Sequence, residues 1–335
     1  IMILPIALLL QKQDTNLSNN EKVKILKDFL GGYNKTGQEH LFTCPKCNHH
    51  KKKLSVNVDK DVFKCWICDY RGNSIYRLVR KYASYEKRSK WQELSGKLNL
   101  LDFENILESI FPQNEPEEEI VIDLPSEFVS LANKSNSIEA KIAKNYLNKR
   151  NITDKDILFW KIGYCSSGEY AGRVIIPSFN ESGDCNFFIA RTYRDDWRKY
   201  MNPRTSKSKI IFNELYIDWC EDLTLTEGVF DAIVAGKNSV PILGSSLKEQ
   251  SKLFKSIILN DTPVYVALDS DAEEKASFLI QNLIKYDAEV YKVDVFPYSD
   301  VGEMPKKEFL KRKKAARLMS SEDAYLQKFI NSFNF

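Results

Sequence analysis

The chain has 335 residues, a hydrophobic fraction of 43%, a charged fraction of 28% and a formal net charge of +3. This composition excludes a mainly disordered chain, because enough apolar residues are present to bury cores, and the length favours two or three domains. The small net charge does not by itself indicate a nucleic-acid-binding protein, so evidence for nucleic-acid binding must come from the distribution of charge along the chain.

The N-terminal segment begins with ten residues that are apolar and include Pro5. Ten residues cannot span a bilayer, which needs about 20, and neither a preceding basic residue nor a small-residue cleavage site supports a signal peptide. We expect these ten residues to form a buried strand or a disordered extension, or to be an artefact of where the sequence begins. We expect no membrane partner. Residues 21–31 then predict a short helix whose apolar stripe ends at Gly31.

Four of the seven cysteines form two Cys-x-x-Cys pairs, and the other three are scattered singly. This is not a disulfide framework, and it favours a reducing cytoplasm. The pairs are separated by 17 residues, which is typical of a structural zinc site in which four thiolates close a tetrahedron. The expected Zn(2+) ligands are Cys44, Cys47, Cys65 and Cys68. Because four thiolates leave no open coordination position, we expect this zinc to hold shape, and His49 and His50 to be surface residues or contacts.

The residues around the cysteines predict a zinc ribbon with covering helices. The predicted elements are a hairpin over 54–58 and 61–65 and amphipathic helices over 75–82, 90–98 and 103–111. The ribbon also carries a lysine run over 51–53 and two aromatic residues, Trp66 and Tyr70. These residues either contact phosphates and stack on bases or form a solvated lysine run with packing aromatics, and the sequence leaves both interpretations open.

The second half of the chain begins after an acidic stretch. Residues 113–123 carry five acids and a proline without a basic residue, which predicts a linker. Residues 143–160 predict two helices, the second capped by Thr153, and residues 173–192 are rich in β-forming residues. From Leu223 onward, short apolar strands alternate with helices, as in a parallel α/β sheet. No Gly-x-x-x-x-Gly-Lys phosphate loop is present, so no helicase motor of that type lies on this chain.

Acidic residues follow three of the predicted strands. Glu227 follows the strand from Leu223, Asp269 and Asp271 follow the strand from Val264, and Asp300 follows a third apolar run. The carboxyl ends of parallel strands meet at one edge of a sheet, where ligands gather. Because clustered carboxylates repel one another, such a cluster favours a bound hard dication such as Mg²⁺.

A basic strip over residues 187–213 contains seven basic residues against two acids and is interleaved with Tyr193, Trp197 and Tyr200. The basic residues are Arg191, Arg194, Arg198, Lys199, Arg204, Lys207 and Lys209. Phosphate neutralisation combined with base stacking suits a single-stranded template or a nucleoside triphosphate. A solvated basic face is the alternative.

These motifs resemble those of the DnaG-type bacterial and phage DNA primases over residues 25–80 and 140–305. The resembling segments are the cysteine pairs with the following GNSI at 72–75, the basic GRVIIPSFNESGDCNFFIAR at 172–191 with KYMNP at 199–203, and the Toprim-like LTEGVFDAIVA at 225–235, ILGSSL at 242–247 and ALDSDAEEKA at 267–276. The resemblance implies an α+β multidomain fold, in which a zinc ribbon with helices precedes a basic α/β subdomain and an α/β Toprim domain. The expected domains are a zinc-ribbon template-binding domain at 1–112, an acidic linker at 113–125, the basic part of the polymerase core at 126–222 and the Toprim metal-binding domain at 223–335.

The resemblance also implies residue roles. Glu227, Asp269 and Asp271 are the expected catalytic residues, and together with Asp300 they are the expected ligands of Mg(2+) or Mn(2+). Arg191 and Lys199 match the residues that line the nucleotide and template groove of the family. The other expected nucleic-acid or nucleotide contacts, from the basic strip and the ribbon, are Arg194, Asn202, Lys207, Lys209 and Trp66. Gly302 departs from the pattern, since the family often has an acid or an asparagine there.

The expected activity is synthesis of short RNA primers on single-stranded DNA by two-metal nucleotidyl transfer. The expected partners are the DNA template, ribonucleoside triphosphates and a replicative helicase supplied in trans. The expected location is the cytoplasm, or that of a host if the protein is phage-encoded. The alternatives are a non-catalytic zinc-ribbon accessory that binds single-stranded DNA, and another Toprim enzyme, either a topoisomerase or a nuclease.

Overall fold

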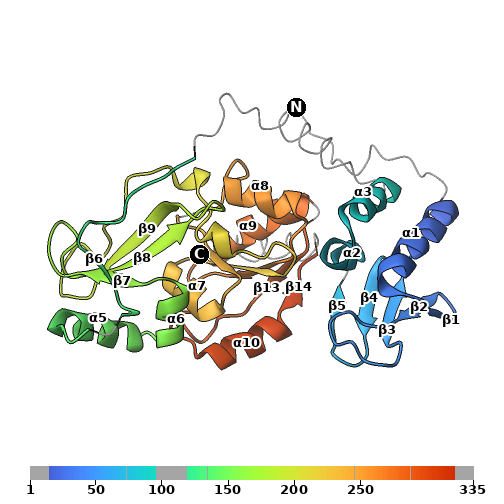
Figure 1. Ribbon diagram of the computed structural model, residues 1–335, viewed down its shortest axis with the longest axis horizontal. Coiled ribbons are helices and arrows are strands. Elements are labelled where there is room, and N and C mark those ends of the chain that lie inside the picture. The colour runs from blue at the N-terminus through green and yellow to red at the C-terminus, as the bar shows by residue number, and fades with distance from the viewer. Residues whose placement is uncertain are drawn as a thin grey trace. The chain divides into compact units, whose positions relative to one another are not determined.

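The computed structural model describes residues 15–72, 74–95, 119–133, 135–244, 246–286 and 288–320. The chain divides into two compact units, 1–112 and 113–335 (Figure 1). The N-terminal ten residues and the helix expected at 103–111 lie outside the described residues. No helix in the described part of the chain is long and apolar enough to cross a membrane.

In its described residues, the first unit is a five-stranded antiparallel sheet with three helices. Its elements are α1 (Thr15–Leu30), β1 (Asn34–Thr36), β2 (Glu39–Phe42), β3 (Leu54–Asn57), β4 (Val62–Cys65), β5 (Arg71–Gly72), α2 (Tyr76–Tyr82) and α3 (Tyr85–Leu94), and the strand order is β1-β2-β3-β4-β5. The predicted hairpin is confirmed, since β3 and β4 pair with Leu54 opposite Cys65. The predicted first helix is confirmed as well, although it begins earlier, and Gly31 ends it with a φ of +82° that favours glycine.

The second unit begins with a four-stranded antiparallel sheet. Its elements are β6 (Phe128–Ser130), α5 (Ile138–Asn148), α6 (Asp154–Phe159), β7 (Gly163–Cys165), β8 (Arg173–Phe179), β9 (Cys185–Thr192), and the short turns η2 (Lys207–Lys209) and η3 (Glu214–Tyr216). The predicted Thr153 cap is confirmed: the Asp156 amide donates to the Thr153 hydroxyl, and the Thr153 amide donates to the Asp156 carboxylate.

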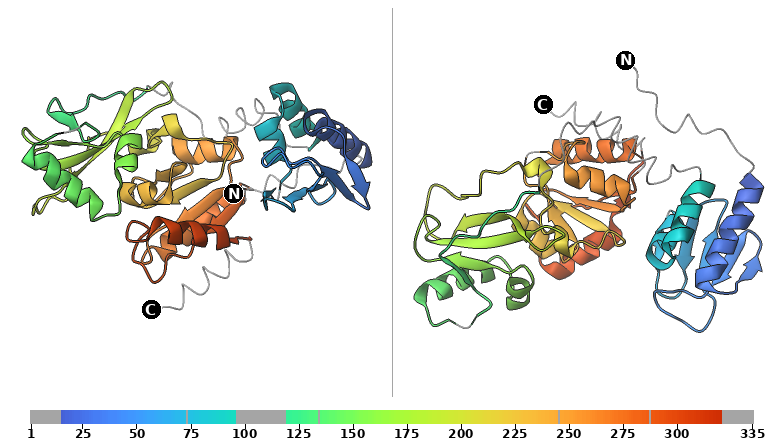
Figure 2. Two further views of the ribbon diagram at one scale, coloured as in Figure 1. Left: turned by 60° about the horizontal axis from the view of Figure 1, so that its bottom comes forward. Right: turned by 45° about the horizontal axis from the view of Figure 1, so that its top comes forward.

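A second sheet follows, with its first four strands parallel (Figure 2). Its elements are β10 (Leu223–Thr226), α7 (Val229–Ala235), β11 (Ser239–Pro241), α8 (Lys252–Leu259), β12 (Val264–Ala267), α9 (Glu273–Lys285), β13 (Val290–Lys292), α10 (Lys306–Ala315) and β14 (Arg317–Leu318), in the order β11-β10-β12-β13-β14. The α+β multidomain class is thus confirmed. Lys306 on α10 pairs with Asp156 on α6 at 2.5 Å and so ties the two sheets of this unit together.

Candidate functional site

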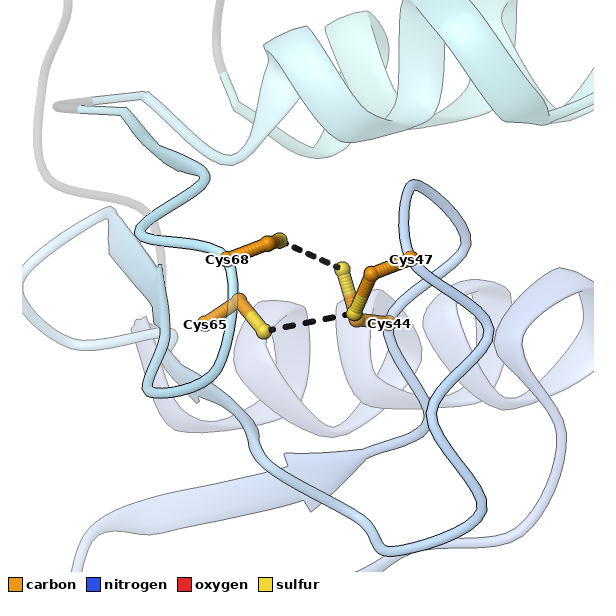
Figure 3. Close-up of side chains that lie close together, drawn as sticks. All are labelled: Cys44, Cys47, Cys65 and Cys68. Atoms are coloured by element: carbon orange, nitrogen blue, oxygen red, sulfur yellow. Dashed lines mark hydrogen bonds between the residues drawn. The ribbon is translucent and has the colours of Figure 1, made fainter.

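The first candidate site lies where two chain turns bring the cysteine pairs together (Figure 3). One pair precedes β3 and the other begins at the last residue of β4. The ligand atoms of Cys44, Cys47, Cys65 and Cys68 all lie within 4.8 Å of one another. The sulfur atoms of Cys44 and Cys68 are 3.8 Å apart, and those of Cys47 and Cys65 are 3.9 Å apart. A ZnS₄ tetrahedron with Zn–S bonds of about 2.3 Å has edges of about 3.8 Å, so the quartet fits a zinc ion.

The electrostatics of this quartet also favour a cation. Burial raises the pKa of the Cys44 thiol, so its thiolate form requires a nearby positive charge. Among the described residues, the metal-ligand group consists of the four cysteines and includes neither His49 nor His50. His49 instead accepts a hydrogen bond from the Lys51 amide, and its ring lies 4.3 Å from that of His50.

Trp66 lies between the two cysteines of the second pair and is 64% exposed. The Lys64 ammonium is 4.7 Å from the centre of its ring. An exposed ring beside a cation suits stacking on a base next to a phosphate, so the arrangement is compatible with the predicted nucleic-acid contact.

The second candidate site lies at the carboxyl edge of the parallel sheet. Glu227 directly follows β10, while Asp269 and Asp271 follow β12. Asp300 lies in the loop between β13 and α10. β10 and β12 are neighbouring parallel strands, with Thr226 opposite Ala267, so their acidic residues emerge side by side.

These acids interact electrostatically. Burial raises the pKa of Asp269 to about 7, with further contributions from the charges of Asp231, Glu227, Asp300 and Asp271. The carboxylates are therefore close enough to destabilise one another's charged forms, as expected of a cation site.

Two carboxylate oxygens at this edge, Oε2 of Glu227 and Oδ1 of Asp269, are buried and have no hydrogen-bond partner among the described residues. A buried unpaired carboxylate oxygen is costly, and a dication is the ligand that would satisfy both atoms. The other oxygen of Glu227 pairs with the Lys275 ammonium at 3.1 Å. Lys275 thus supplies part of the positive charge that the cluster requires.

The carboxylate oxygens are spread more widely than the cysteine sulfurs. Among the described residues, the four cysteines form a group close enough to hold a metal ion directly, whereas no group of three or more acids does. This spacing suits Mg²⁺, which usually keeps several waters and is held by one or two carboxylates. Direct ligation by Glu227, Asp269, Asp271 and Asp300 therefore stays a prediction.

The predicted basic strip spans β9 and the loop that follows it. Arg191 donates to the Tyr146 hydroxyl at 3.2 Å, and its guanidinium lies 4.5 Å from the centre of the Tyr200 ring. Arg194 pairs with Glu139 on α5 at 2.8 Å. This ion pair reduces the charge that Arg194 can offer to a phosphate.

The remaining predicted nucleic-acid contacts differ in whether their side chains are available to bind a ligand. Asn202 accepts a hydrogen bond from the Ala190 amide at 3.1 Å, so its side-chain oxygen holds the loop against β9. Lys199, Lys207 and Lys209 are exposed. In the described ranges, none of these three lysines has a carboxylate partner, which leaves their charges available for phosphates.

The chain was also compared with known proteins. No family model matches it. The DNA primase of Halalkalibacterium halodurans is 25% identical to this chain over 85% of this chain and 55% of its own length. The DNA primase of Staphylococcus aureus is 22% identical over 84% of this chain and 56% of its own length. A solved structure of the DnaG primase catalytic domain bound to ssDNA matches with a TM-score of 0.50 and 18% identity, over 59% of this chain and 78% of that chain.

The chain is a relative of the DnaG-type primases. It shares the fold of the DnaG catalytic domain, and the resemblance inferred from its motifs is confirmed. The chain spans about half the length of the curated primases that it matches.

In this DnaG-type relative, the structure adds Asp231 to the acidic site. Its carboxylate is buried, and burial together with the charge of Asp300 raises its pKa to about 6. The amides of Gly228 and Gly302 donate to its two oxygens at 3.0 and 2.8 Å. A Cβ atom at Gly302 would lie 3.0 Å from an oxygen of Asp231 and 3.2 Å from one of Asp300. Glycine therefore lets the loop approach both carboxylates.

A second residue that the motifs did not assign is Arg150. Its guanidinium lies 5.2 Å from the ring centre of Tyr146 and 4.8 Å from that of Phe230. Phe230 belongs to α7, just beyond Glu227, and Tyr146 contacts Arg191. Arg150 thus lies between the basic strip and the acidic edge, outside the segment in which the sequence concentrates its positive charge.

Proposed function

We propose that the protein is a DNA primase that joins ribonucleotides on single-stranded DNA. The observation that carries the proposal is the pair of buried, unpartnered carboxylate oxygens of Glu227 and Asp269 at the carboxyl edge of the sheet. The similarity to primases and the charge of the basic strip support it. Mg²⁺ or Mn²⁺ bound at this edge would lower the pKa of the attacking 3′-hydroxyl and neutralise charge on the triphosphate.

The chain's own residues would orient the reactants. Asp269, Asp271 and Asp300 would hold the dications, and Glu227 would accept the proton of the attacking hydroxyl or hold a dication. Arg191 and Lys199 would bind phosphates of the nucleotide or the template, since both belong to the basic strip. Lys275 would keep Glu227 in place through their ion pair until the dications bind.

The zinc ribbon would grip the template through Trp66 and its neighbouring lysines, while zinc maintains the fold of the ribbon. We further propose that ribonucleoside triphosphates are the substrates and that a replicative helicase supplied in trans is a partner, in keeping with the similarity to DNA primases. Free cysteines are compatible with the reducing cytoplasm that we propose as the location.

The experiment is to incubate the protein with single-stranded DNA, labelled ribonucleotides and Mg²⁺, and to compare wild type with Glu227→Gln. We expect short labelled oligoribonucleotides from the wild type and a yield lower by orders of magnitude from the variant. DNA binding should persist in the variant, because the basic strip is unchanged.

The alternatives give different products. An accessory protein would bind DNA without incorporating ribonucleotides, a nuclease would shorten the template, and a topoisomerase would relax supercoiled DNA. Any of these outcomes without labelled primers would overturn the proposed function.

A further inference from the structure

The loop that follows β9 carries an unusually exposed tryptophan. The loop returns to the strand, with the Thr192 amide donating to the Lys199 carbonyl at 3.1 Å, and Trp197 lies between these two residues in sequence. Trp197 is 86% exposed, the largest value among the exposed large hydrophobic residues of the described ranges. Leaving an indole in water forgoes the free energy that its burial would supply, so a role outside the folded core is indicated.

A buried arginine holds the loop on both sides of this tryptophan. Arg173 in β8 is 5% exposed, and its Nη2 donates to the Asp196 carboxylate at 2.7 Å and to the Arg198 carbonyl at 2.9 Å. The Asp196 carboxylate also accepts from the Arg198 amide at 2.8 Å. Hydrogen bonding by Arg173 holds the pKa of Asp196 below its ordinary value, so Arg173 and Asp196 form an ion pair at neutral pH. The backbone is thus fixed while the indole between the two anchored residues is exposed.

The surroundings of the ring are positively charged. The Arg198 guanidinium lies 5.1 Å from the centre of the Trp197 ring, and the exposed Lys199 follows directly. The two tyrosines of the strip are engaged in contacts within the protein. The Tyr193 hydroxyl donates to Glu139 at 2.7 Å, and Tyr200 is 45% exposed beneath the Arg191 guanidinium.

We propose that Trp197 stacks on an unpaired base of single-stranded nucleic acid, while Arg198 and Lys199 contact the neighbouring phosphates. The proposal rests on the proposed function, since it assigns one base-binding position to the template. Every base offers a π-face, so this contact would hold the strand without selecting a sequence. Charge complementarity favours a polyanion as the occupant, because the strip carries a net charge of +5.

The test distinguishes binding to bases from binding to phosphates. Binding of an oligo-dT strand and of an abasic strand of equal length is measured by fluorescence anisotropy for wild type, Trp197→Ala and Trp197→Phe. We expect Trp197→Ala to bind oligo-dT about 5- to 100-fold more weakly, which is the scale of one base–aromatic stack, and to bind the abasic strand as the wild type does. Trp197→Phe should retain most of the affinity for oligo-dT, because it retains an aromatic face.

The matched control is Phe278→Ala, which removes another exposed aromatic residue of the same unit, located on α9. It should bind both strands as the wild type does. Thermal unfolding of each variant shows whether the fold is retained. If Trp197→Ala unfolds, tryptophan fluorescence tests the stacking instead. Oligo-dT should quench the fluorescence of the wild type more than the abasic strand does, and this difference should be lost in Trp197→Phe, which lacks the Trp197 indole.

Unchanged affinity of Trp197→Ala for oligo-dT, or an equal loss on the abasic strand, would overturn stacking. The two proposals fail separately. Unchanged binding by Trp197→Ala, combined with loss of primer synthesis in Glu227→Gln, overturns this inference alone. A wild type that shows the base-dependent difference but makes no primers overturns the proposed function alone.

Discussion

Asp269→Asn should make the protein more stable and less active at the same time. The pKa of Asp269 is raised to about 7 from an ordinary value of 3.8, mainly by burial. At about 1.36 kcal/mol per pKa unit this difference corresponds to about 4 kcal/mol, and because the group is only about half-buried, solvent screening reduces the figure to about 2 kcal/mol. The side chain of asparagine is nearly isosteric and uncharged, so the substitution removes this penalty.

The sign of the pH dependence follows from the raised pKa. The folded state holds the proton of Asp269 more tightly than the unfolded state does, so ionisation costs stability as the pH rises from about 4 to about 7. The variant should therefore match the wild type near pH 4 and exceed it at pH 8 in the absence of dications. A gain of about 2 kcal/mol corresponds to an increase in Tm of about 4–8 °C for a unit of this size.

The assay is thermal unfolding at pH 4 and pH 8, with and without Mg²⁺, alongside primer synthesis. Added Mg²⁺ should raise the Tm of the wild type more than that of the variant, and primer yield should fall by orders of magnitude in the variant. Asp271→Asn is the control for stability, because Asp271 is exposed. Equal Tm values for wild type and Asp269→Asn at pH 8 would refute the reasoning about the buried charge, and equal primer yields would refute the metal role of Asp269.

Three further predictions concern other parts of the molecule. Cys65→Ser should lose the zinc and templated initiation but retain more extension of a pre-annealed primer, as checked by metal analysis and primer assays; a variant that keeps one zinc per chain would contradict the structural-zinc interpretation. Lys199→Ala should weaken DNA binding and reduce the salt slope by about 1, and an unchanged slope would assign the lysine to a solvated face. Gly302→Ala should weaken Mg²⁺ binding without unfolding the protein, since its Cβ would press on Asp231 and Asp300. Calorimetric titration with Mg²⁺ measures the affinity, and an affinity equal to that of the wild type would contradict this prediction.

The sequence predicts the elements well because each depends on local signals. The cysteine spacing predicts the ribbon, the Thr153 cap predicts the start of α6, and alternating strands and helices predict the parallel sheet. Local signals in the sequence could not identify Asp231 as a residue of the acidic site. Its importance arises from burial and from the approach of the loop around Gly302, which is 71 residues away in sequence.

The sequence also could not show which cations of the basic strip can bind phosphates. A count of charges treats its cations alike, but folding pairs Arg194 with Glu139 and leaves Lys199 exposed, while the buried Arg173 of β8 anchors the loop through Asp196. Which cations can bind a phosphate therefore depends on tertiary partners that no local pattern specifies. The acidic edge was predictable because parallel strands bring their ends together, whereas the strip consists mostly of loop, whose side chains are sorted by contacts distant in sequence.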